Sequence, residues 1–397
     1  MWARLRLDIG WADIFYGMVQ SVIGVKRDAW QTRVEAVWSP RGACLSTLSV
    51  RTGFDLLLGV LDFPPRSEIL ITALTVRDMV GIIEHHGLVA VPIDLNCLDL
   101  APDPKHLRSA ITPACRAIVV AQYFGGRNSL EPIARIAKEK GILLIEDAAQ
   151  AYTADSYRGS PHADVSLFSF GPIKTASALG GAMAMVRSPG VLARMRERQA
   201  AYPEQSRWAY LRRLMKYAVL KALSCRFAYG RVVGVCRLFG VDYDGRINAA
   251  VKGFAGADFF DQIRRQPCAA LLAVMARRLG RPNAARMAVR RENGTMLMER
   301  LQPPLMCPGG RAADHTFWVF PVWTSDSAAT IGKLRRLGFD ATQGDSMVVV
   351  DSPAGRSELR AAGVERIRAG WVFVPCYAEM PPGEILRLAE ALSTRSD

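Results

Sequence analysis

Short apolar runs alternate with amphipathic stretches between about residues 45 and 190, and this alternation constrains the fold more than any other feature of the chain. Apolar runs predict strands at residues 67–74, 88–95, 115–125 and 142–147. Between them, amphipathic residues 75–87 and 128–141 predict helices that end at Gly87 and Gly141. Strands that alternate with helices form βαβ units. The sequence therefore predicts an α/β fold in which a large domain holds a mostly parallel sheet and a smaller α/β domain follows it.

Several classes of protein are disfavoured by composition. No uninterrupted apolar run reaches the roughly eighteen residues that a transmembrane helix needs, and the first twenty residues lack the apolar core of a signal peptide. The eight cysteines are scattered without a C-x-x-C pair, and the five histidines have no metal-ligand spacing. These features predict a cytoplasmic protein with reduced thiols and no metal site.

A single lysine lies in a stretch of small, apolar and hydroxyl side chains. Residues 166–181, SLFSFGPIKTASALGG, contain a single charged side chain, that of Lys174. Alternation over residues 165–170 predicts a strand that Gly171 and Pro172 end, so Lys174 lies in the loop beyond it. Most lysines are solvated surface residues. A desolvated lysine, however, has a lowered pKa and can form a Schiff base with a carbonyl group.

Polar groups that could assist such a lysine are predicted at the same edge of the sheet. Asp147 ends the strand at 142–147, Gln150 follows three residues later, and Ser169 ends the strand before Lys174. Ligands of parallel sheets lie beyond the carboxyl ends of the strands. Asp147 could alternatively be only a helix N-cap. Together the four groups fit pyridoxal phosphate, whose ring nitrogen needs a carboxylate and whose aldehyde needs a lysine.

A phosphate group also needs hydroxyl and backbone donors. Arg51, Thr52 and Gly53 open a predicted helix whose apolar face is Leu56, Leu57 and Val60. The N-terminus of a helix binds anions through its free N–H groups. We therefore predict that Arg51 and Thr52 contact the phosphate.

The motifs LLIEDAAQAY and ADVSLFSFGPIKTASALGGA resemble those of the DegT-type sugar aminotransferases, which depend on pyridoxal phosphate and have the fold type I architecture. The resemblance extends to AIVVAQYFGGRNSLEPIARIAKEKG, to DHTFWVFPVW and to the C-terminal helix. It implies that Lys174 holds the cofactor covalently and moves the substrate proton, and that Asp147 pairs with the ring nitrogen. Gln150 would lie near the phenolic oxygen, and Ser169, Arg51 and Thr52 would bind the phosphate. Because Lys174 is present, the histidine-containing dehydratase branch of the family is disfavoured.

The chain departs from the family pattern in three places, and the resemblance implies that the cofactor chemistry is kept while the substrate side diverges. Arg51 stands where the family has glycine, and Val76 stands where an aromatic residue stacks on the ring. The partner subunit's Asn-Tyr-Arg element has only a loose counterpart in QIRRQP, residues 262–267.

The positive charge is concentrated in one segment. Residues 205–240 hold eight of the fourteen excess positive charges and no acidic residue. Part of this segment has helical apolar spacing, which predicts an amphipathic helix. Its apolar stripe could pack on the protein's own domain or on a dimer partner. Alternatively, residues 207–240 could lie on an anionic membrane at the inner membrane surface. Nucleic acid binding is disfavoured because no recognition motif accompanies the charge.

The sequence thus predicts four segments: an N-terminal arm (1–44), the core of the large domain that binds pyridoxal phosphate (45–200), a basic amphipathic insertion (201–260), and connecting helices with the small domain (261–397). The predicted function is that of a homodimeric aminotransferase. It would move an amino group from an amino acid, with glutamate as the expected donor, to a keto group of a nucleotide-linked sugar. The alternatives are a pyridoxal phosphate enzyme acting on a membrane-bound or lipid-linked substrate, and a catalytically degenerate regulatory protein that binds the cofactor.

Overall fold

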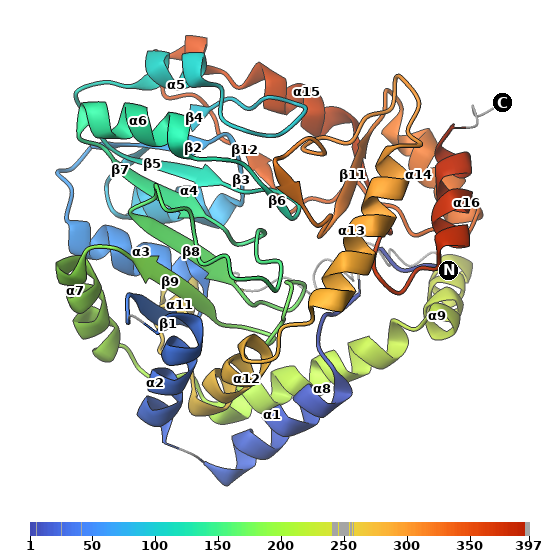
Figure 1. Ribbon diagram of the computed structural model, residues 1–397, viewed down its shortest axis with the longest axis horizontal. Coiled ribbons are helices and arrows are strands. Elements are labelled where there is room, and N and C mark those ends of the chain that lie inside the picture. Colours follow the sequence, from blue (N-terminus) through green and yellow to red (C-terminus); the bar gives the residue numbers. More distant parts are fainter. Residues whose placement is uncertain are drawn as a thin grey trace.

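A seven-stranded sheet forms the centre of the large domain (Figure 1). The structure is a computed structural model that describes residues 1–4, 6–24, 26–40, 42–239 and 258–393, together with residues 245, 254 and 256. The strand order is β1-β9-β8-β7-β5-β2-β4. In chain order these strands are β1 (Cys44–Thr47), β2 (Glu68–Thr72), β4 (Val89–Ile93), β5 (Cys115–Ala121), β7 (Leu143–Asp147), β8 (Val165–Ser169) and β9 (Ala182–Val186).

Strands β4, β2, β5, β7 and β8 pair in parallel, whereas β9 is antiparallel to both β8 and β1. The predicted α/β class with a mostly parallel sheet is confirmed. Asp147 pairs in register with Leu167, so β7 and β8 end side by side. The loops that leave these two strands therefore emerge at one edge of the sheet, which is where Asp147 and Lys174 were predicted to meet.

Helices cover both faces of the sheet because successive strand residues point to opposite sides and both sets are apolar. One face, with Ile71 and Val119, packs against α3 (Val50–Leu61), α4 (Arg77–His85) and α7 (Pro189–Ala200). The other face, with Leu70 and Val120, packs against α5 (Pro104–Ala110) and α6 (Glu131–Lys140). Helix α6 ends at Gly141, as predicted, and Gly141 is in the left-handed region. The sequence favoured Asn128 or Ser129 as the N-cap, but the N-cap position is Leu130.

The small domain is built on β11 (Phe320–Trp323) and β13 (Trp371–Val374), which pair antiparallel. Its helices are α14 (Ser327–Arg336), α15 (Ala362–Gly370) and α16 (Pro382–Ser393), with a short 3-10 helix, η1 (Ser357–Leu359). Helix α13 (Ala284–Met298) leads into it. Two short ladders join it to the large domain: β10 (Asp314–His315) pairs with β6 (Gly126–Arg127), and β12 (Val348–Val349) pairs with β3 (Leu74–Thr75).

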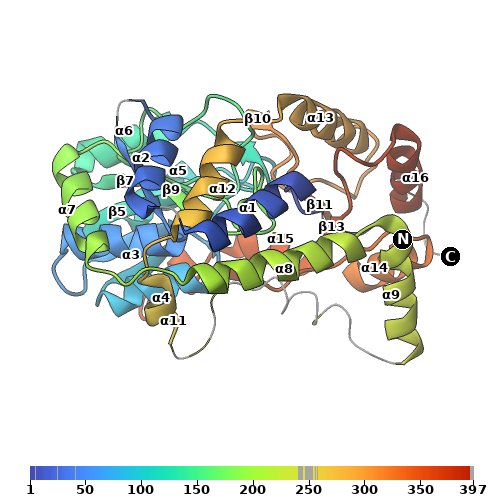
Figure 2. The same ribbon diagram turned by 90° about the horizontal axis from the view of Figure 1, so that it is seen from below.

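Most of the remaining helices lie below the central sheet as drawn in Figure 1, but α9 (Arg226–Leu238) lies beside the small domain near α16; Figure 2 shows the molecule from below. The others are α1 (Trp11–Ile23), α2 (Arg27–Trp38), α8 (Arg207–Leu223), α11 (Phe259–Ile263) and α12 (Ala269–Leu279). Residues 240–244, 246–253, 255 and 257 of the predicted insertion lie outside the described residues. In the part of the chain that the structure describes, no helix combines the length and the apolar character needed to span a membrane.

The spacing of Leu211, Leu214, Met215, Ala218, Val219, Ala222 and Leu223 predicts one apolar packing stripe on α8, but of these residues only Leu214 is buried. Tyr210, Leu214 and Tyr217 are buried, whereas Met215 and Val219 are exposed. The sequence spacing identified the helix correctly but mixed residues of two faces, because its apolar residues occur on both sides of the helix.

Candidate active site

Lys174 lies in a tight loop just beyond β8. Its backbone N–H donates to the carbonyl of Gly171 at 3.0 Å, which closes a turn after the strand. The carbonyl of the preceding residue, Ile173, accepts a hydrogen bond of 2.7 Å from the indole Nε1 of Trp318. The Nζ atom of Lys174 lies 4.0 Å from the centre of the Trp318 ring. The small domain thus holds the lysine loop in place through one aromatic side chain.

The surroundings of Lys174 disfavour its charged form. Burial lowers the pKa of its amine to about 7; the negative charge of Asp147 opposes this shift and the positive charge of Arg51 adds to it. An ordinary lysine has a pKa near 10.4, so almost none of it is neutral at physiological pH. Lys174 therefore presents a large fraction of nucleophilic amine at neutral pH, which is the property that a Schiff-base lysine requires.

Asp147 ends β7 and carries the opposite shift. Burial raises the pKa of its carboxyl group, against the effects of the Ala149 N–H and of the charges on Lys174 and Arg51. Its Oδ1 accepts from the Ala149 N–H at 3.0 Å. The residues that follow form turns, so the alternative interpretation of Asp147 as a helix N-cap is wrong. The carboxylate is held at the sheet edge, where a cationic ligand group would relieve its cost of burial.

A buried neighbour fixes the loop after Asp147. Glu146 points to the other face of β7 and is fully buried. Its carboxylate accepts from the Ser160 N–H at 2.8 Å, from Ser166 Oγ at 2.7 Å and from Gln122 Nε2 at 3.1 Å. Sequence reasoning assigned Glu146 no role, although its position beside Asp147 in IED was visible.

Gln150 and Ser169 both lie at the same edge. The Oε1 atom of Gln150 accepts from the backbone N–H of Phe124 at 3.0 Å, which fixes the side-chain amide. The Oγ atom of Ser169 accepts from the Gly171 N–H at 3.4 Å, in the turn that leads to Lys174. The structure brings both predicted residues to the loops that carry Asp147 and Lys174. Their roles toward a cofactor stay predictions.

The predicted phosphate residues begin α3. Ser49 caps the helix by accepting from the Thr52 N–H at 3.1 Å, while the hydroxyl of Thr52 donates to the carbonyl of Ile263 at 2.8 Å. Arg51 forms an ion pair of 2.5 Å with Asp78. Its charge acts on both Lys174 and Asp147, which places the first turn of α3 near them. In this arrangement Thr52 and Arg51 have partners within the chain, and their contact with phosphate stays a prediction.

The two other departures from the family pattern also have partners within the chain. Val76 packs against the apolar core between α3, α4 and the sheet. Arg264, in the QIRRQP segment, donates to both oxygens of Asp55, at 3.0 and 2.9 Å. In the described chain, this arginine therefore anchors α11 to α3.

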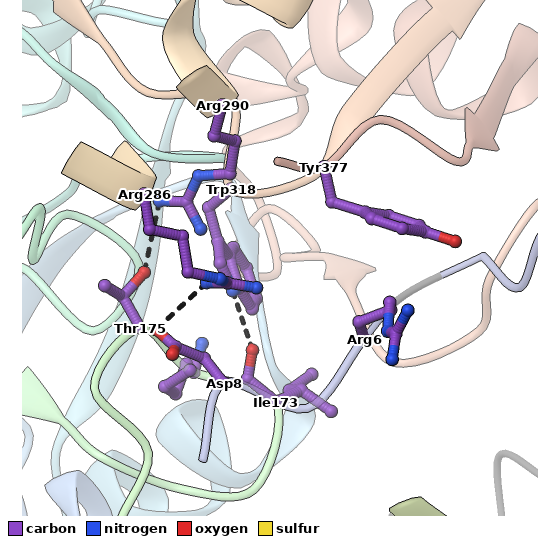
Figure 3. A pocket seen from close by; sticks show the side chains of 9 residues that line it. Arg6, Asp8, Ile173, Thr175, Arg286, Arg290, Trp318 and Tyr377 are labelled. Atoms are coloured by element: carbon purple, nitrogen blue, oxygen red, sulfur yellow. Dashed lines mark hydrogen bonds and ion pairs between the residues drawn. The ribbon is translucent and has the colours of Figure 1, made fainter. Parts of the chain in front are cut away.

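A second wall of the site is formed mostly by residues that sequence reasoning did not single out. Figure 3 shows this pocket, lined by Arg6, Asp8, Ile173, Lys174, Thr175, Arg286, Arg290, Trp318 and Tyr377. Arg290 is buried and donates to the carbonyl of Thr316 at 2.9 Å and to Thr175 Oγ1 at 3.2 Å; burial lowers its pKa to about 10. Asp8 accepts from the Ala176 N–H at 2.9 Å and pairs with Arg286. Ile173, Lys174 and Thr175 lie in the stretch SLFSFGPIKTASALGG, whereas the segments with Trp318 and Tyr377 were used only for the fold.

Comparison with known proteins agrees with this architecture. The sequence profile of the DegT/DnrJ/EryC1/StrS aminotransferase family matches residues 22–209. A pleiotropic regulatory protein of Geobacillus stearothermophilus is 34% identical over 119 residues, which cover 29% of this chain and 32% of the relative. The match thus spans about a third of that relative's length. The matched residues 22–209 contain the whole central sheet, Asp147 and Lys174.

Solved structures match the fold over nearly the entire chain. The sugar aminotransferase CalS13 from Micromonospora echinospora is 20% identical, with a TM-score of 0.71 and 99% of each chain covered. DesI, solved in the presence of its TDP-sugar product, is 17% identical, with a TM-score of 0.68 and coverages of 98% and 91%. The ntda protein of Bacillus subtilis, with bound PMP, is 17% identical, with a TM-score of 0.66 and coverages of 96% and 80%. The predicted fold type I architecture is confirmed.

Proposed function

We propose that this protein is a pyridoxal phosphate-dependent aminotransferase that moves an amino group from an amino acid, glutamate in the first instance, to a keto group of a nucleotide-linked sugar. One observation carries the proposal: a lysine with a lowered pKa and an aspartate with a raised pKa lie at the same sheet edge. Ionisable groups with shifted pKa values cluster at functional sites. The family match and the sugar aminotransferase structures support the same chemistry.

The residues at the site fit the cofactor. When bound, pyridoxal phosphate supplies an electron sink for carbanion chemistry next to the amino group. Asp147 would bind the protonated ring nitrogen, which gives its half-buried carboxylate a cationic partner. Lys174 would bind the cofactor aldehyde through its neutral amine and, when displaced, hold and return the substrate proton at Nζ. Trp318 orients the Lys174 loop, and Ser169 with the first turn of α3 would hold the phosphate.

The proposal also covers the acceptor substrate, a nucleotide-linked sugar, and the oligomeric state, a homodimer. DesI was solved with a TDP-sugar product, which supports a nucleotide-linked sugar as the acceptor. A second copy of the chain would complete the substrate side of each site. Arg264 is engaged by Asp55, so it is not available in this arrangement for a role across the dimer.

A regulatory role is the second candidate, because the curated relative is named a pleiotropic regulatory protein. The two candidates differ in turnover. We expect purified protein to bind pyridoxal phosphate and convert it to the amine form when glutamate is added, as a change in the cofactor's absorbance. A nucleotide-linked keto-sugar should then reverse that change. Bound cofactor that stays unchanged across a panel of amino donors would favour the regulatory role instead.

A further inference from the structure

Helices α1 and α8 lie side by side and antiparallel on one face of the molecule (Figure 2). At one end, the Nζ atom of Lys221 lies 5.9 Å from the ring centre of Trp11. At the other end, Arg207 lies so close to Gly24 that a Cβ atom there would be 2.5 Å from its guanidinium. Because Trp11 begins α1 and Lys221 lies near the end of α8, the two helices run in opposite directions and form a two-helix layer.

The inner side of this layer is well packed. Ile14 of α1 and Tyr210 and Leu214 of α8 join the apolar core together with α12. The hydroxyl of Tyr210 donates to the carbonyl of Ala178 at 2.8 Å, in the loop that follows Lys174. Gly17 lets the helices approach closely, since a Cβ atom there would lie 3.0 Å from Leu214. The position of the layer is therefore fixed by the protein's own core.

The outer side of the layer is apolar and exposed. On α1, Trp11 is 54%, Phe15 68% and Val22 57% exposed. On α8, Trp208 is 50%, Met215 47% and Val219 58% exposed. The spacings i, i+4, i+11 and i, i+7, i+11 place each set along one side of its helix. Exposed apolar patches of this kind mark interaction surfaces.

Basic residues accompany these apolar side chains. Arg212 and Lys216 are exposed on α8 and lie between Trp208 and Val219 in the sequence. In the part of the chain that is described, no ion pair involves either of them. Residues 205–240 contain eight basic residues and no acid. We define the α1–α8 face by its exposed members: Trp11, Phe15, Val22, Trp208, Arg212, Met215, Lys216 and Val219.

We propose that the α1–α8 face docks on an anionic lipid surface. An interfacial helix places aromatic and aliphatic side chains at the headgroup level while its Lys and Arg residues contact anionic lipids, and this face combines both kinds of residue. A two-fold dimer interface brings the same patch of both subunits together, so this face would meet its own positive charge. A nucleic acid would use the basic residues but would leave the row from Trp208 to Val219 without an apolar partner.

Vesicle flotation tests the proposal, and its result does not depend on the proposed function. The full chain is mixed with phosphatidylcholine vesicles that contain or lack phosphatidylglycerol, at low and at high salt. We expect binding only to the vesicles with phosphatidylglycerol, and weaker binding at high salt. Each basic residue near such a surface contributes about 1 kcal/mol. Since about 1.4 kcal/mol is tenfold, Arg212→Glu/Lys216→Glu should bind about thirtyfold more weakly or worse.

Two further variants separate charge from apolar contact. Trp208→Ala/Val219→Ala keeps every charge and should weaken binding at least about tenfold, which corresponds to about 60 Å² of apolar surface at 25 cal/mol per Å². The control Lys138→Glu/Lys140→Glu makes the same charge change on exposed residues of α6, across the sheet from α8. It should bind like the unmodified chain. Urea unfolding of all four proteins verifies that each is folded.

Several results would overturn the proposal. One is that the chain fails to float with anionic vesicles at low salt. Another is that the α6 control loses binding as much as the α8 variant. A third is that a DNA duplex binds as tightly as the vesicles and the Trp208→Ala/Val219→Ala variant keeps full binding to both. A fourth is that the α8 variants turn a dimer into a monomer in sedimentation velocity while vesicle binding is unchanged.

Discussion

Asp55 is buried and Asp147 is half-buried, and the pKa values of the two carboxyl groups are shifted in opposite directions. Burial alone would raise the pKa of Asp55, but hydrogen bonds from His86 and Arg264 outweigh it and lower the pKa to about 2. For Asp147, burial raises the pKa, and one backbone N–H with two nearby charges does not offset it. The chain supplies enough hydrogen-bond and charge partners to offset the burial of the Asp55 carboxylate. The partners of Asp147 do not offset the free-energy cost of desolvating its charge. A carboxylate whose desolvation the chain does not offset indicates a ligand-binding role. A carboxylate whose desolvation is offset by partners within the chain indicates a structural role.

The largest effect should come from Lys174, the group beside the uncompensated carboxylate. Lys174→Ala should abolish turnover, because Lys174 is the only lysine in residues 166–181, the stretch that carries β8 and the loop beyond it. Lys174→Arg should fail equally, since a guanidinium stays protonated and is a poor nucleophile. Steady-state assays with glutamate and a keto-sugar provide the measurement. Multiple turnovers by either variant would remove Lys174 from its assigned role.

Asp147→Asn should lower turnover by about a hundredfold or more, which corresponds to about 3 kcal/mol in the barrier. The reason is the loss of the negative charge that pairs with the cofactor's ring nitrogen. In the apoprotein, the same change should leave the free energy of unfolding equal or higher, because it removes an uncompensated charge. Urea titration of cofactor-free protein measures this. Near-normal turnover, or a marked loss of apoprotein stability, would show that Asp147 has a structural role, as Asp55 does.

Asp55→Asn should have the reverse pattern. It leaves Arg264 and His86 without their charge partner inside the protein, so we expect a loss of about 3 kcal/mol in the free energy of unfolding at neutral pH. Turnover per folded molecule should be nearly unchanged. Urea unfolding and an assay normalised to folded protein give the two values. A variant as stable as the original chain would show that this cluster is not a structural anchor.

The same cluster predicts a pH dependence. The folded pKa of Asp55, about 2, lies below the unfolded value of about 3.9. Its contribution to stability is therefore complete above the unfolded value and disappears as the pH falls through the folded one. The stability difference between the original chain and Asp55→Asn should shrink over that acid range. A difference that is constant with pH would contradict the assigned shift.

Arg51→Ala should produce the smallest effect, a change in the pH profile of Lys174. The charge of Arg51 contributes to lowering the pKa of the lysine, so its removal should move that pKa upward. Pulse labelling with acetic anhydride, followed by mass spectrometry of the Lys174 peptide, reports the neutral amine in the apoprotein. The exposed Lys138 serves as the internal reference. A Lys174 labelling midpoint that stays at the same pH, or moves to lower pH, in Arg51→Ala would contradict the electrostatic role of Arg51.

The sheet and its edge could be predicted because they rest on local patterns. Continuous apolar runs predicted β2, β5 and β7, whose residues are apolar on both faces of the sheet. Because ligands bind at the carboxyl ends of parallel strands, Asp147 and Lys174 were predicted to lie in one site. The far wall could not be predicted, because Arg290 and Asp8 reach the site only through the docking of the small domain and the N-terminal segment. Spacing along the chain carries no information about such contacts.

Helix α8 shows a second limit. Its apolar spacing predicted a helix, yet it could not tell which apolar side faces the core. The choice depends on α1 and α12, which accept Tyr210 and Leu214 and leave Val219 outside. For the same reason, Arg264 in the QIRRQP segment could not be assigned from sequence, since its partner Asp55 lies far away along the chain.

The most direct test of the account is to locate the covalent attachment of the cofactor. Protein purified with pyridoxal phosphate is reduced with borohydride, digested and analysed by mass spectrometry. The account predicts a phosphopyridoxyl group on the peptide that contains Lys174, and its absence from that peptide in Lys174→Ala. A phosphopyridoxyl group on a different lysine of the original chain, or on none, would contradict the claim that the uncompensated pair Asp147–Lys174 marks the functional site.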